Sequence, residues 1–274
     1  MSWFEAVILG VVQGLTEFLP ISSTGHLRIV PAFLGWEDPG AAFTAIVQLG
    51  TMAAVLIYFR RELWRIVVTW LASLRRPELR SSLDARMGWY VIIGTVPIAV
   101  LGLIFSNQIE TTARSLYLIG TMLIVFGLVM WLVDRGSRRV RDEGDVARRD
   151  AIVVGLAQAL ALIPGVSRSG ATITAGLLMG LKREAAARFS FLLSVPAIVL
   201  SGLYEFAKVL TGEESTDVAY SELAIATLVA FVVGYASIAF LLRYLASHSL
   251  AVFVWYRILL GALVLVLAGA SVIS

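Results

Sequence analysis

The chain has 274 residues, of which 59% are hydrophobic and only 15% are charged. Soluble domains contain about 25% charged residues, so this composition excludes an ordinary soluble fold and also intrinsic disorder. The chain has no cysteine and two histidines, which excludes disulfides, cysteine chemistry and a metal site built from several histidines. The net charge of +3 is not gathered into basic patches interleaved with aromatic residues, so we expect no nucleic-acid partner. These counts predict an integral membrane protein.

The first predicted element is an interrupted apolar stretch over residues 3–34, which breaks at the polar segment 20–25. Each half is too short to cross a bilayer, and non-helical backbone at membrane depth is tolerated only inside protein or beside a water-filled cavity. We therefore expect a re-entrant helical hairpin with a polar elbow. A second stretch of this kind covers residues 151–181 and breaks at 164–170. The alternative interpretation is that each stretch is one simple span, which would give eight spans in total.

Uninterrupted apolar runs of about 20 residues are long enough to be transmembrane helices. Three of them follow each predicted hairpin, and a charged linker over residues 135–150 separates the two groups. The six predicted spans are residues 40–59, 88–106, 116–134, 187–206, 222–244 and 252–272.

The two hairpins resemble each other, which predicts an internal repeat. An odd number of spans separates them, so the second copy is inverted relative to the first, as in folds where broken helices meet near the midplane. We expect an all-α membrane domain with a first repeat over residues 1–134 and a second over 151–274. With an offset of 145 residues, the matched pairs include Gly10 and Gly155, Gln13 and Gln158, Ser22 and Ser167, and Gly25 and Gly170.

The distribution of lysine and arginine predicts the orientation, because these residues accumulate in cytoplasmic loops. Of the 22 basic residues, 17 lie in four segments that the predicted topology places on one side. The opposite loops, residues 107–115 and 207–221, carry only Arg114 and Lys208. Both termini are then expected outside. The four basic segments are residues 60–87, 135–150, 182–188 and 243–251.

Ionisable residues inside apolar segments are expensive and are treated as functional candidates. In the first elbow, Gln13 and Glu17 share a helix face because they are four residues apart. His26 follows Ser23 by three residues, so a helical turn would bring the imidazole near the Ser23 hydroxyl, and histidine is the usual base for a serine nucleophile. For Ser22 and Thr24, capping of the following helix is an equal alternative to ligand binding.

The second elbow has the composition of an anion-binding site. Arg168 offers a planar fork that grips phosphate at two points, and it stands at the expected start of a helix, where free N–H groups attract anions. If the two elbows face each other, a divalent ion could bridge Glu17 to phosphate oxygens, since Mg²⁺ is typically held by one or two carboxylates plus substrate phosphates. The neighbouring candidates for substrate binding are Ser167, Ser169, Gly170 and Thr172.

These elements carry a family resemblance. Residues 13–26 read QGLTEFLPISSTGH and residues 164–172 read PGVSRSGAT, which resemble the two signatures of undecaprenyl-diphosphate phosphatases, the bacitracin-resistance proteins. The resemblance implies hydrolysis of the long-chain prenyl diphosphate to the monophosphate in the bacterial cytoplasmic membrane, which recycles the lipid carrier for cell-wall synthesis. It also implies a site open to the outer side and a divalent cation, Mg²⁺ or Ca²⁺.

The resemblance further implies residue roles: Ser23 as nucleophile, His26 as its partner, Glu17 in metal or proton chemistry, and the second elbow around the diphosphate. Many members carry glutamate where this chain has Gln13, so a metal here would rely on Glu17 and phosphate oxygens. Arg28 could add phosphate affinity or extend towards the membrane surface. The alternative function is an inverted-repeat transporter or lipid flippase, which would need binding groups but no activated serine. The sequence leaves the oligomeric state open, a homodimer included.

Overall fold

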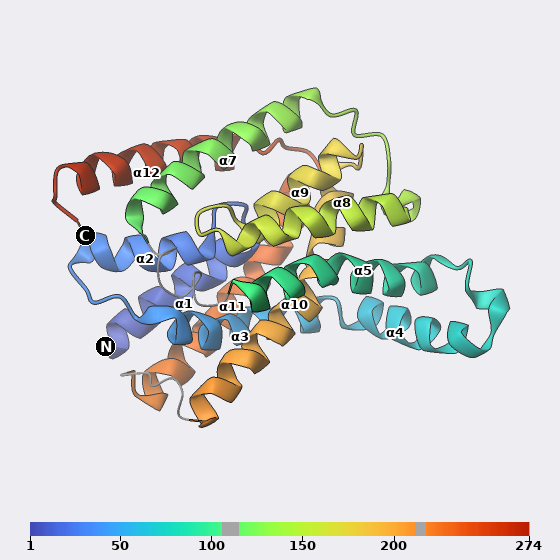
Figure 1. Cartoon of the computed structure of the whole chain (residues 1–274), viewed down its shortest axis with the longest axis horizontal. Helices are drawn as coiled ribbons and strands as arrows, with labels where there is room; N and C mark the ends of the chain where they lie inside the picture. The colour runs from blue at the N-terminus through green and yellow to red at the C-terminus, as the bar shows by residue number, and fades with distance from the viewer. Residues whose placement is uncertain (106–114, 212–217, 274) are drawn as a thin grey trace.

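The computed structural model describes residues 1–105, 115–211 and 218–273, and these residues fold into a helical assembly (Figure 1). Within those ranges no β-strand is formed, and the one isolated β-bridge pairs Arg141 with Leu181. Within the predicted outer loops, residues 107–114 and 212–217 lie outside the described residues, and the ends of 207–221 belong to the flanking helices. The prediction of an all-α protein is confirmed.

Five helices are long and apolar enough to cross a membrane, and a sixth candidate is a bent pair. The pair consists of α3 (Gly40–Tyr58) and α4 (Arg60–Arg75), which meet at an angle of 76° between residues 42–58 and 60–75. The range of five to six agrees with an integral membrane protein and includes the six spans expected from the sequence. The five single helices are α5 (Leu83–Ile104), α7 (Leu116–Gly136), α10 (Arg183–Thr211), α11 (Tyr220–Leu245) and α12 (Ala251–Gly269).

Helix α4 was not expected from the sequence, because the seven basic residues of 60–87 were read only as a topology signal. The segment also carries apolar residues at the spacing of one helix face, and these side chains are exposed in the structure. In Figure 1, α4 runs beside the first half of α5 and both project from one end of the molecule. The exposed apolar residues of α4 are Trp64, Val67, Val68, Leu71 and Leu74.

Both predicted interruptions are real breaks in the helices. Helix α1 (Trp3–Phe18) ends before Pro20, and α2 (Ser23–Leu34) starts three residues after it. In the second stretch α8 (Arg148–Ala159) ends five residues before Pro164, and a 3₁₀ turn leads to the elbow and α9 (Arg168–Leu178). At 1.5 Å per residue, none of these four helices reaches the roughly 30 Å of a hydrocarbon core.

Each broken stretch packs against the other half of the chain. Helix α1 lies mainly against α11, and α8 lies mainly against α5. Glycines allow these close approaches: a Cβ atom on Gly10 would lie 2.6 Å from the carbonyl oxygen of Ala226, and one on Gly155 would lie 2.5 Å from the Cα atom of Gly94. Small residues at such crossings are typical of membrane helices. The packing brings the two elbows into the interior.

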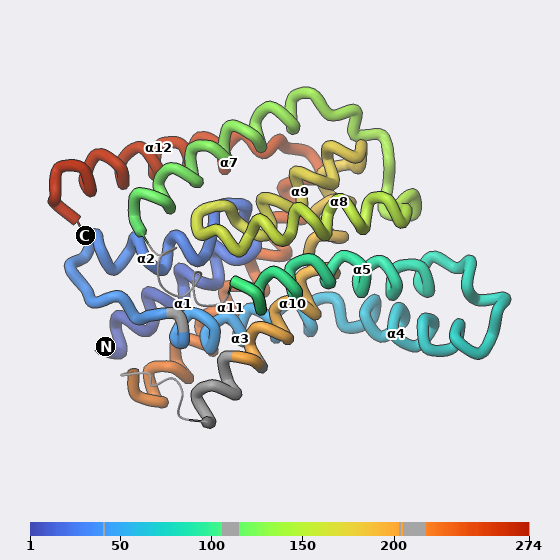
Figure 2. The backbone as a smooth tube through the Cα atoms, in the orientation of Figure 1, coloured from blue at the N-terminus to red at the C-terminus, as the bar shows by residue number. Residues whose placement is uncertain are grey.

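The four basic segments lie towards one end of the structure, and both termini lie at the opposite end (Figure 2). Arg188 donates hydrogen bonds to Glu62 at 2.6 Å and to Glu143 at 2.9 Å. Arg183 donates to Asp134 at 2.7 Å, and the same carboxylate accepts the backbone N–H of Leu250 at 3.1 Å. We refer to this region as the arginine-rich end.

Candidate active site

Both elbows use the same backbone device. Ser22 and Ser167 precede α2 and α9 with φ angles of 79° and 77°, a region that non-glycine residues rarely occupy. Their hydroxyls accept the N–H groups of Gly25 at 3.4 Å and Gly170 at 3.1 Å, so both serines act as helix caps. Such backbone strain costs about 1–3 kcal/mol and is concentrated at functional sites. The structure therefore supports capping as the role of Ser22, which was one of its two alternatives, and Ser167 has the same role.

The elbows contact each other directly. The backbone N–H of Gly165 in the second elbow donates to the Ser22 hydroxyl at 3.2 Å. The Ser169 hydroxyl donates to the carbonyl oxygen of Leu19 in the first elbow at 3.1 Å. The sequence left the facing arrangement as a condition, and the structure brings the two elbows together.

A buried arginine from α12 connects the two elbows. The Arg257 side chain is fully buried, with an exposed fraction of 0%. Its guanidinium donates to the carbonyl oxygen of Pro20 at 3.1 Å and to that of Gly165 at 2.7 Å. Sequence reasoning missed this residue, although the rule applied to Glu17 and Arg168 also covers an arginine inside a predicted span.

The Glu17 carboxylate is the centre of a hydrogen-bond cluster. One oxygen accepts the Ser23 hydroxyl at 2.6 Å and the Gln13 amide at 3.1 Å, and the other accepts the Gln48 amide at 2.9 Å. The Arg168 guanidinium approaches Glu17 to 3.9 Å. A carboxylate that accepts a serine hydroxyl at this distance is placed to take its proton.

His26 has other partners than the one expected from the sequence. Its Nδ1 atom lies 2.7 Å from the Ser22 carbonyl oxygen, and its Nε2 atom lies 2.7 Å from the Tyr256 hydroxyl. A carbonyl oxygen can only accept, so Nδ1 carries the proton, and Nε2 of the neutral ring accepts from Tyr256. The expected contact of His26 with the Ser23 hydroxyl is therefore replaced by a Ser23–Glu17 pair. Tyr256, 230 residues from His26, carries no local signal in the sequence.

Arg168 has donors without partners. Its Nε and Nη1 atoms are buried and make no hydrogen bond to the described residues. Buried donors left unsatisfied cost about 1–3 kcal/mol each, and more when they are charged. An anion held in the fork of this guanidinium would satisfy both atoms.

The remaining candidates from the sequence are engaged within the protein or stand apart. The Thr172 hydroxyl donates to the Arg168 carbonyl oxygen at 2.7 Å and also contacts Ser190. Thr24 is exposed and lies 3.4 Å from the Ser22 hydroxyl. Arg28 forms an ion pair with Asp38 at 3.3 Å. Among the sequence candidates, Arg168 is therefore the cationic group that approaches Glu17.

The donor set permits one metal ion with few protein ligands. The described residues contain no group of three or more histidine, cysteine, aspartate or glutamate side chains that could hold a metal. The Glu17 carboxylate and the buried Gln13 amide oxygen, which has no hydrogen-bond partner, are both hard oxygen donors. Because Gln13 directs its amide nitrogen to Glu17, the two oxygens reach one divalent cation only with the amide turned over; phosphate oxygens and water would complete the coordination.

The fold and the site define an integral membrane protein in which a carboxylate–serine pair lies beside a guanidinium with two unpartnered donors, an arrangement suited to phosphoryl transfer. The family described as Bacitracin resistance protein BacA matches residues 6–263, and the chain belongs to that family. The undecaprenyl-diphosphatase of Thermobifida fusca is 56% identical over 274 residues, which cover this whole chain and 93% of that protein. Those of Micrococcus luteus and Nocardioides sp. are 56% and 53% identical, over the whole chain and 100% and 99% of their own lengths.

Proposed function

We propose that this protein hydrolyses undecaprenyl diphosphate to undecaprenyl phosphate and inorganic phosphate. The observation that carries the proposal is the Ser23–Glu17 hydrogen bond of 2.6 Å beside the buried, partnerless donors of Arg168. A nucleophile with its base, next to a cationic fork, is what phosphoryl transfer requires. The names of the relatives and the match to the family support the choice of substrate.

In this proposal the Ser23 Oγ atom attacks the terminal phosphorus, and its proton moves to the Glu17 carboxylate. The bond from that phosphorus to the bridging oxygen breaks, so undecaprenyl phosphate leaves with the electron pair. Water then attacks the phosphoserine, the Ser23 oxygen leaves with the proton that Glu17 returns to it, and the protons of the water depart with inorganic phosphate, so Glu17 is again a carboxylate. Arg168 binds the terminal phosphate oxygens, and His26, fixed by Ser22 and Tyr256, borders the first elbow.

A divalent cation, Mg²⁺ or Ca²⁺, belongs to the same proposal. Glu17 and the Gln13 amide oxygen would hold it, and it would neutralise charge on the diphosphate. Because Glu17 also takes the Ser23 proton in this proposal, Glu17→Gln should lower turnover and raise the cation concentration needed for half-maximal phosphate release, and a raised cation concentration should not restore the turnover of the wild type.

The finer topology is also proposed: six spans, two re-entrant hairpins and an inverted repeat in the bacterial cytoplasmic membrane. The arginine-rich end is placed in the cytoplasm, and the termini and the substrate entrance are placed outside. Single cysteines can be introduced freely because the chain has none. An impermeant thiol reagent applied to intact cells should label Ser215→Cys and not Asp142→Cys, and the opposite pattern would reverse the orientation.

The function is tested with purified protein and undecaprenyl diphosphate in detergent. We expect phosphate release that a chelator suppresses and added Mg²⁺ or Ca²⁺ restores. A protein that moves the lipid between leaflets of proteoliposomes without releasing phosphate would instead be the transporter or flippase considered above. Activity that survives complete removal of divalent ions would retain the hydrolase and remove the cation from the proposal.

A further inference from the structure

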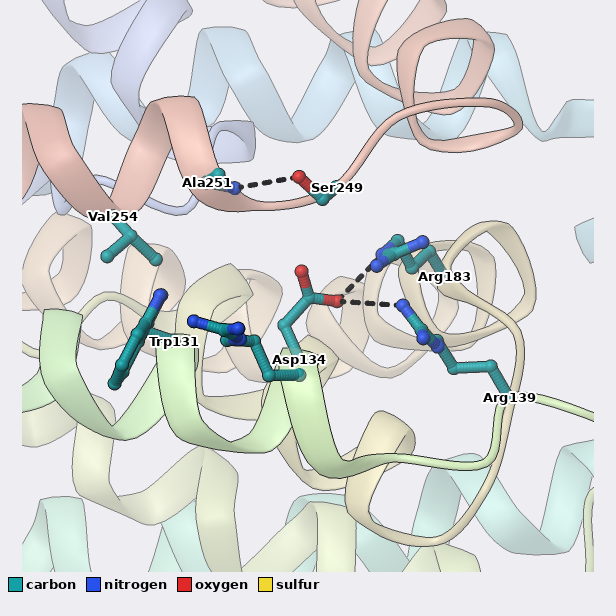
Figure 3. Close-up of a pocket in the computed structure, with 8 residues that line it drawn as sticks. Trp131, Asp134, Arg139, Arg183, Ser249, Ala251 and Val254 are labelled. Carbon is teal, nitrogen blue, oxygen red and sulfur yellow. Dashed lines mark hydrogen bonds and ion pairs between the residues drawn. The ribbon is translucent and has the colours of Figure 1, made fainter.

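A cavity of about 380 Å³ opens at the arginine-rich end, between the end of α7 and the start of α12 (Figure 3). None of its lining residues belongs to either elbow, so it is separate from the proposed active site. The residues that line it are Trp131, Asp134, Arg135, Arg139, Arg183, Ser249, Ala251 and Val254.

The cavity lining has an excess of positive charge. It contains three guanidinium groups and one carboxylate. That carboxylate, on Asp134, accepts from the Nε atom of Arg183 at 2.7 Å and from the backbone N–H of Leu250 at 3.1 Å, and Arg139 lies 3.9 Å away. Figure 3 shows Arg139 and Arg183 both directed towards Asp134. The Asp134 charge is thus neutralised within the protein, and the cavity lining keeps a net charge of two positive units.

Arg135 keeps its hydrogen-bond donors available, and Arg139 engages the protein only through the ion pair of 3.9 Å between its Nη1 atom and Asp134. The Arg135 guanidinium lies 5.1 Å above the ring of Trp131, and among the described residues it forms no ion pair. Arg139 has a φ angle of 50°, so its main chain holds an arginine in a left-handed conformation beside the cavity. A planar guanidinium presents paired N–H groups that match phosphate oxygens.

The opposite wall is the start of α12, where side chains already accept two backbone N–H groups. That of Leu250 donates to Asp134 at 3.1 Å, and that of Ala251 donates to the Ser249 hydroxyl at 3.4 Å, as Figure 3 shows for the second. The helix dipole still favours negative charge at this wall. Ala251 and Val254 make this wall partly apolar. The cavity therefore combines cationic donors with an apolar side.

The surroundings of the cavity are those expected around the headgroup of a membrane lipid. The helices on both sides expose large apolar side chains near it, with exposed fractions of 62% for Leu132, 62% for Val252 and 56% for Trp255. Such residues face hydrocarbon in a membrane, and the arginines mark the level where the helices leave it. Basic pockets between transmembrane helices at this level bind anionic headgroups.

We propose that this cavity binds the phosphate headgroup of an anionic membrane lipid, with Arg135 and Arg139 as its ligands and the acyl chains lying along α7 and α12. The site is independent of the diphosphate bound between the elbows. A lipid held here would connect the ends of α7 and α12 across Asp134, which already joins α7 to the segment before α12.

The test compares lipid binding to the purified full-length protein by native mass spectrometry, with phosphatidylglycerol, phosphatidylcholine and inorganic phosphate as probes. The wild type should prefer phosphatidylglycerol over phosphatidylcholine. The variant Arg135→Gln/Arg139→Gln should lose about 10- to 30-fold in affinity for phosphatidylglycerol, because each surface arginine near anionic lipid contributes about a factor of five. Arg183 is left unchanged because Asp134 depends on it.

The matched control is Arg75→Gln/Arg76→Gln, which removes two exposed arginines from the same end but outside the cavity. It should retain the preference, and Arg135→Lys/Arg139→Lys should retain most of it. If the double glutamine variant fails to fold, Arg135→Gln alone carries the test, since Arg135 makes no hydrogen bond to another described residue. Equal losses in the cavity and control variants, or no preference in the wild type, would overturn the proposal. Inorganic phosphate competing as strongly as the lipid would show a free-anion site instead.

Discussion

The two elbows share a backbone and differ in chemistry. Ser23 and Arg168 are separated by the repeat offset of 145 residues, and each is the first residue of the helix that follows a strained serine cap. One position carries the hydroxyl proposed to attack phosphorus, and the equivalent position carries the cation proposed to hold it. The comparison teaches that one local fold can supply two different reactive groups when two copies face each other.

The helices that lead into the elbows differ in the same way. Gln13 and Gln158 are equivalent and both buried, but Gln13 donates to Glu17, whereas Gln158 donates to the Gly94 carbonyl oxygen at 3.3 Å. The position equivalent to Glu17 is Leu162. The proton acceptor therefore belongs to the first elbow alone, and the second elbow contributes charge and packing.

The largest expected effect comes from a substitution in the first elbow. Ser23→Ala removes the nucleophile and should lower turnover by more than about 10³-fold, because no neighbouring group replaces its oxygen. Ser23 and Glu17 act in one step, so Ser23→Ala/Glu17→Gln should be little worse than the poorer single variant. Phosphate release from a soluble prenyl diphosphate measures this, with Ser81→Ala as an exposed serine control. Turnover of Ser23→Ala within a few-fold of the wild type would favour direct attack by water.

The second effect tests the equivalent position in the second elbow. Arg168→Lys keeps the charge but loses the bidentate fork, which should cost about 2–4 kcal/mol of transition-state stabilisation, or roughly 30- to 1000-fold in kcat/KM. A second measurement on Arg168→Lys traps the phosphoserine intermediate, and the fraction of enzyme that carries it should fall together with the rate. An unchanged kcat/KM would remove Arg168 from the mechanism and end the comparison.

A smaller effect concerns the support of the first elbow. Tyr256→Phe removes the hydroxyl that bonds His26 Nε2 at 2.7 Å, and a neutral hydrogen bond contributes about 0.5–1.5 kcal/mol, so kcat should fall by roughly tenfold or less. A positioning role predicts an altered pH–rate profile with little change in KM. Loss of thermal stability with an unchanged profile would reduce Tyr256 to a packing residue.

The smallest expected effect concerns Glu62, which lies outside both elbows, and it gives a reference with which the effects at the elbows can be compared. Burial, a hydrogen bond with Glu143 and the charge of Glu143 raise the pKa of Glu62 from 4.5 to about 7, against the lowering effects of Arg188 and Arg65. The folded state then binds this proton more tightly than the unfolded state, so stability should fall as the pH rises from about 4.5 to about 7.

The variant Glu62→Gln should lose less stability over that pH range than the wild type. Because Glu62 is only partly buried, the difference should be no more than about 2–4 °C in Tm, which corresponds to about 1 kcal/mol. Thermal unfolding in detergent at pH 5 and pH 8 measures it. The same pH dependence in both proteins would assign the effect to other groups.

The sequence was sufficient to predict the features that depend on local patterns. The broken helices follow from Pro20 and Pro164 in apolar stretches, and the cap at Ser22, one of the two alternatives for that residue, follows from a hydroxyl before a helix. The placement of Glu17 beside Gln13 follows from their spacing on one helix. Helix α4 was not predicted, because the basic residues of its segment concealed its apolar face.

The partners of the site residues could not be predicted, because they depend on tertiary packing. Whether Ser23 meets Glu17 or His26 depends on how far the chain turns between α1 and α2, which no spacing rule specifies. Tyr256 and Arg257 reach the first elbow from 230 and 237 residues away. Only the presence of an arginine within an apolar span could have pointed to Arg257.

The buried Arg257 has a consequence for motion. Alternating access requires that two halves of a carrier separate and close again around the bound substrate. Here a separation of the elbows would pull the Arg257 guanidinium away from the Pro20 or Gly165 carbonyl oxygen and break a hydrogen bond of a buried charged group, at a cost of about 1.5–3 kcal/mol. The two elbows are therefore expected to stay together while the substrate binds, which favours an enzyme over an alternating-access transporter.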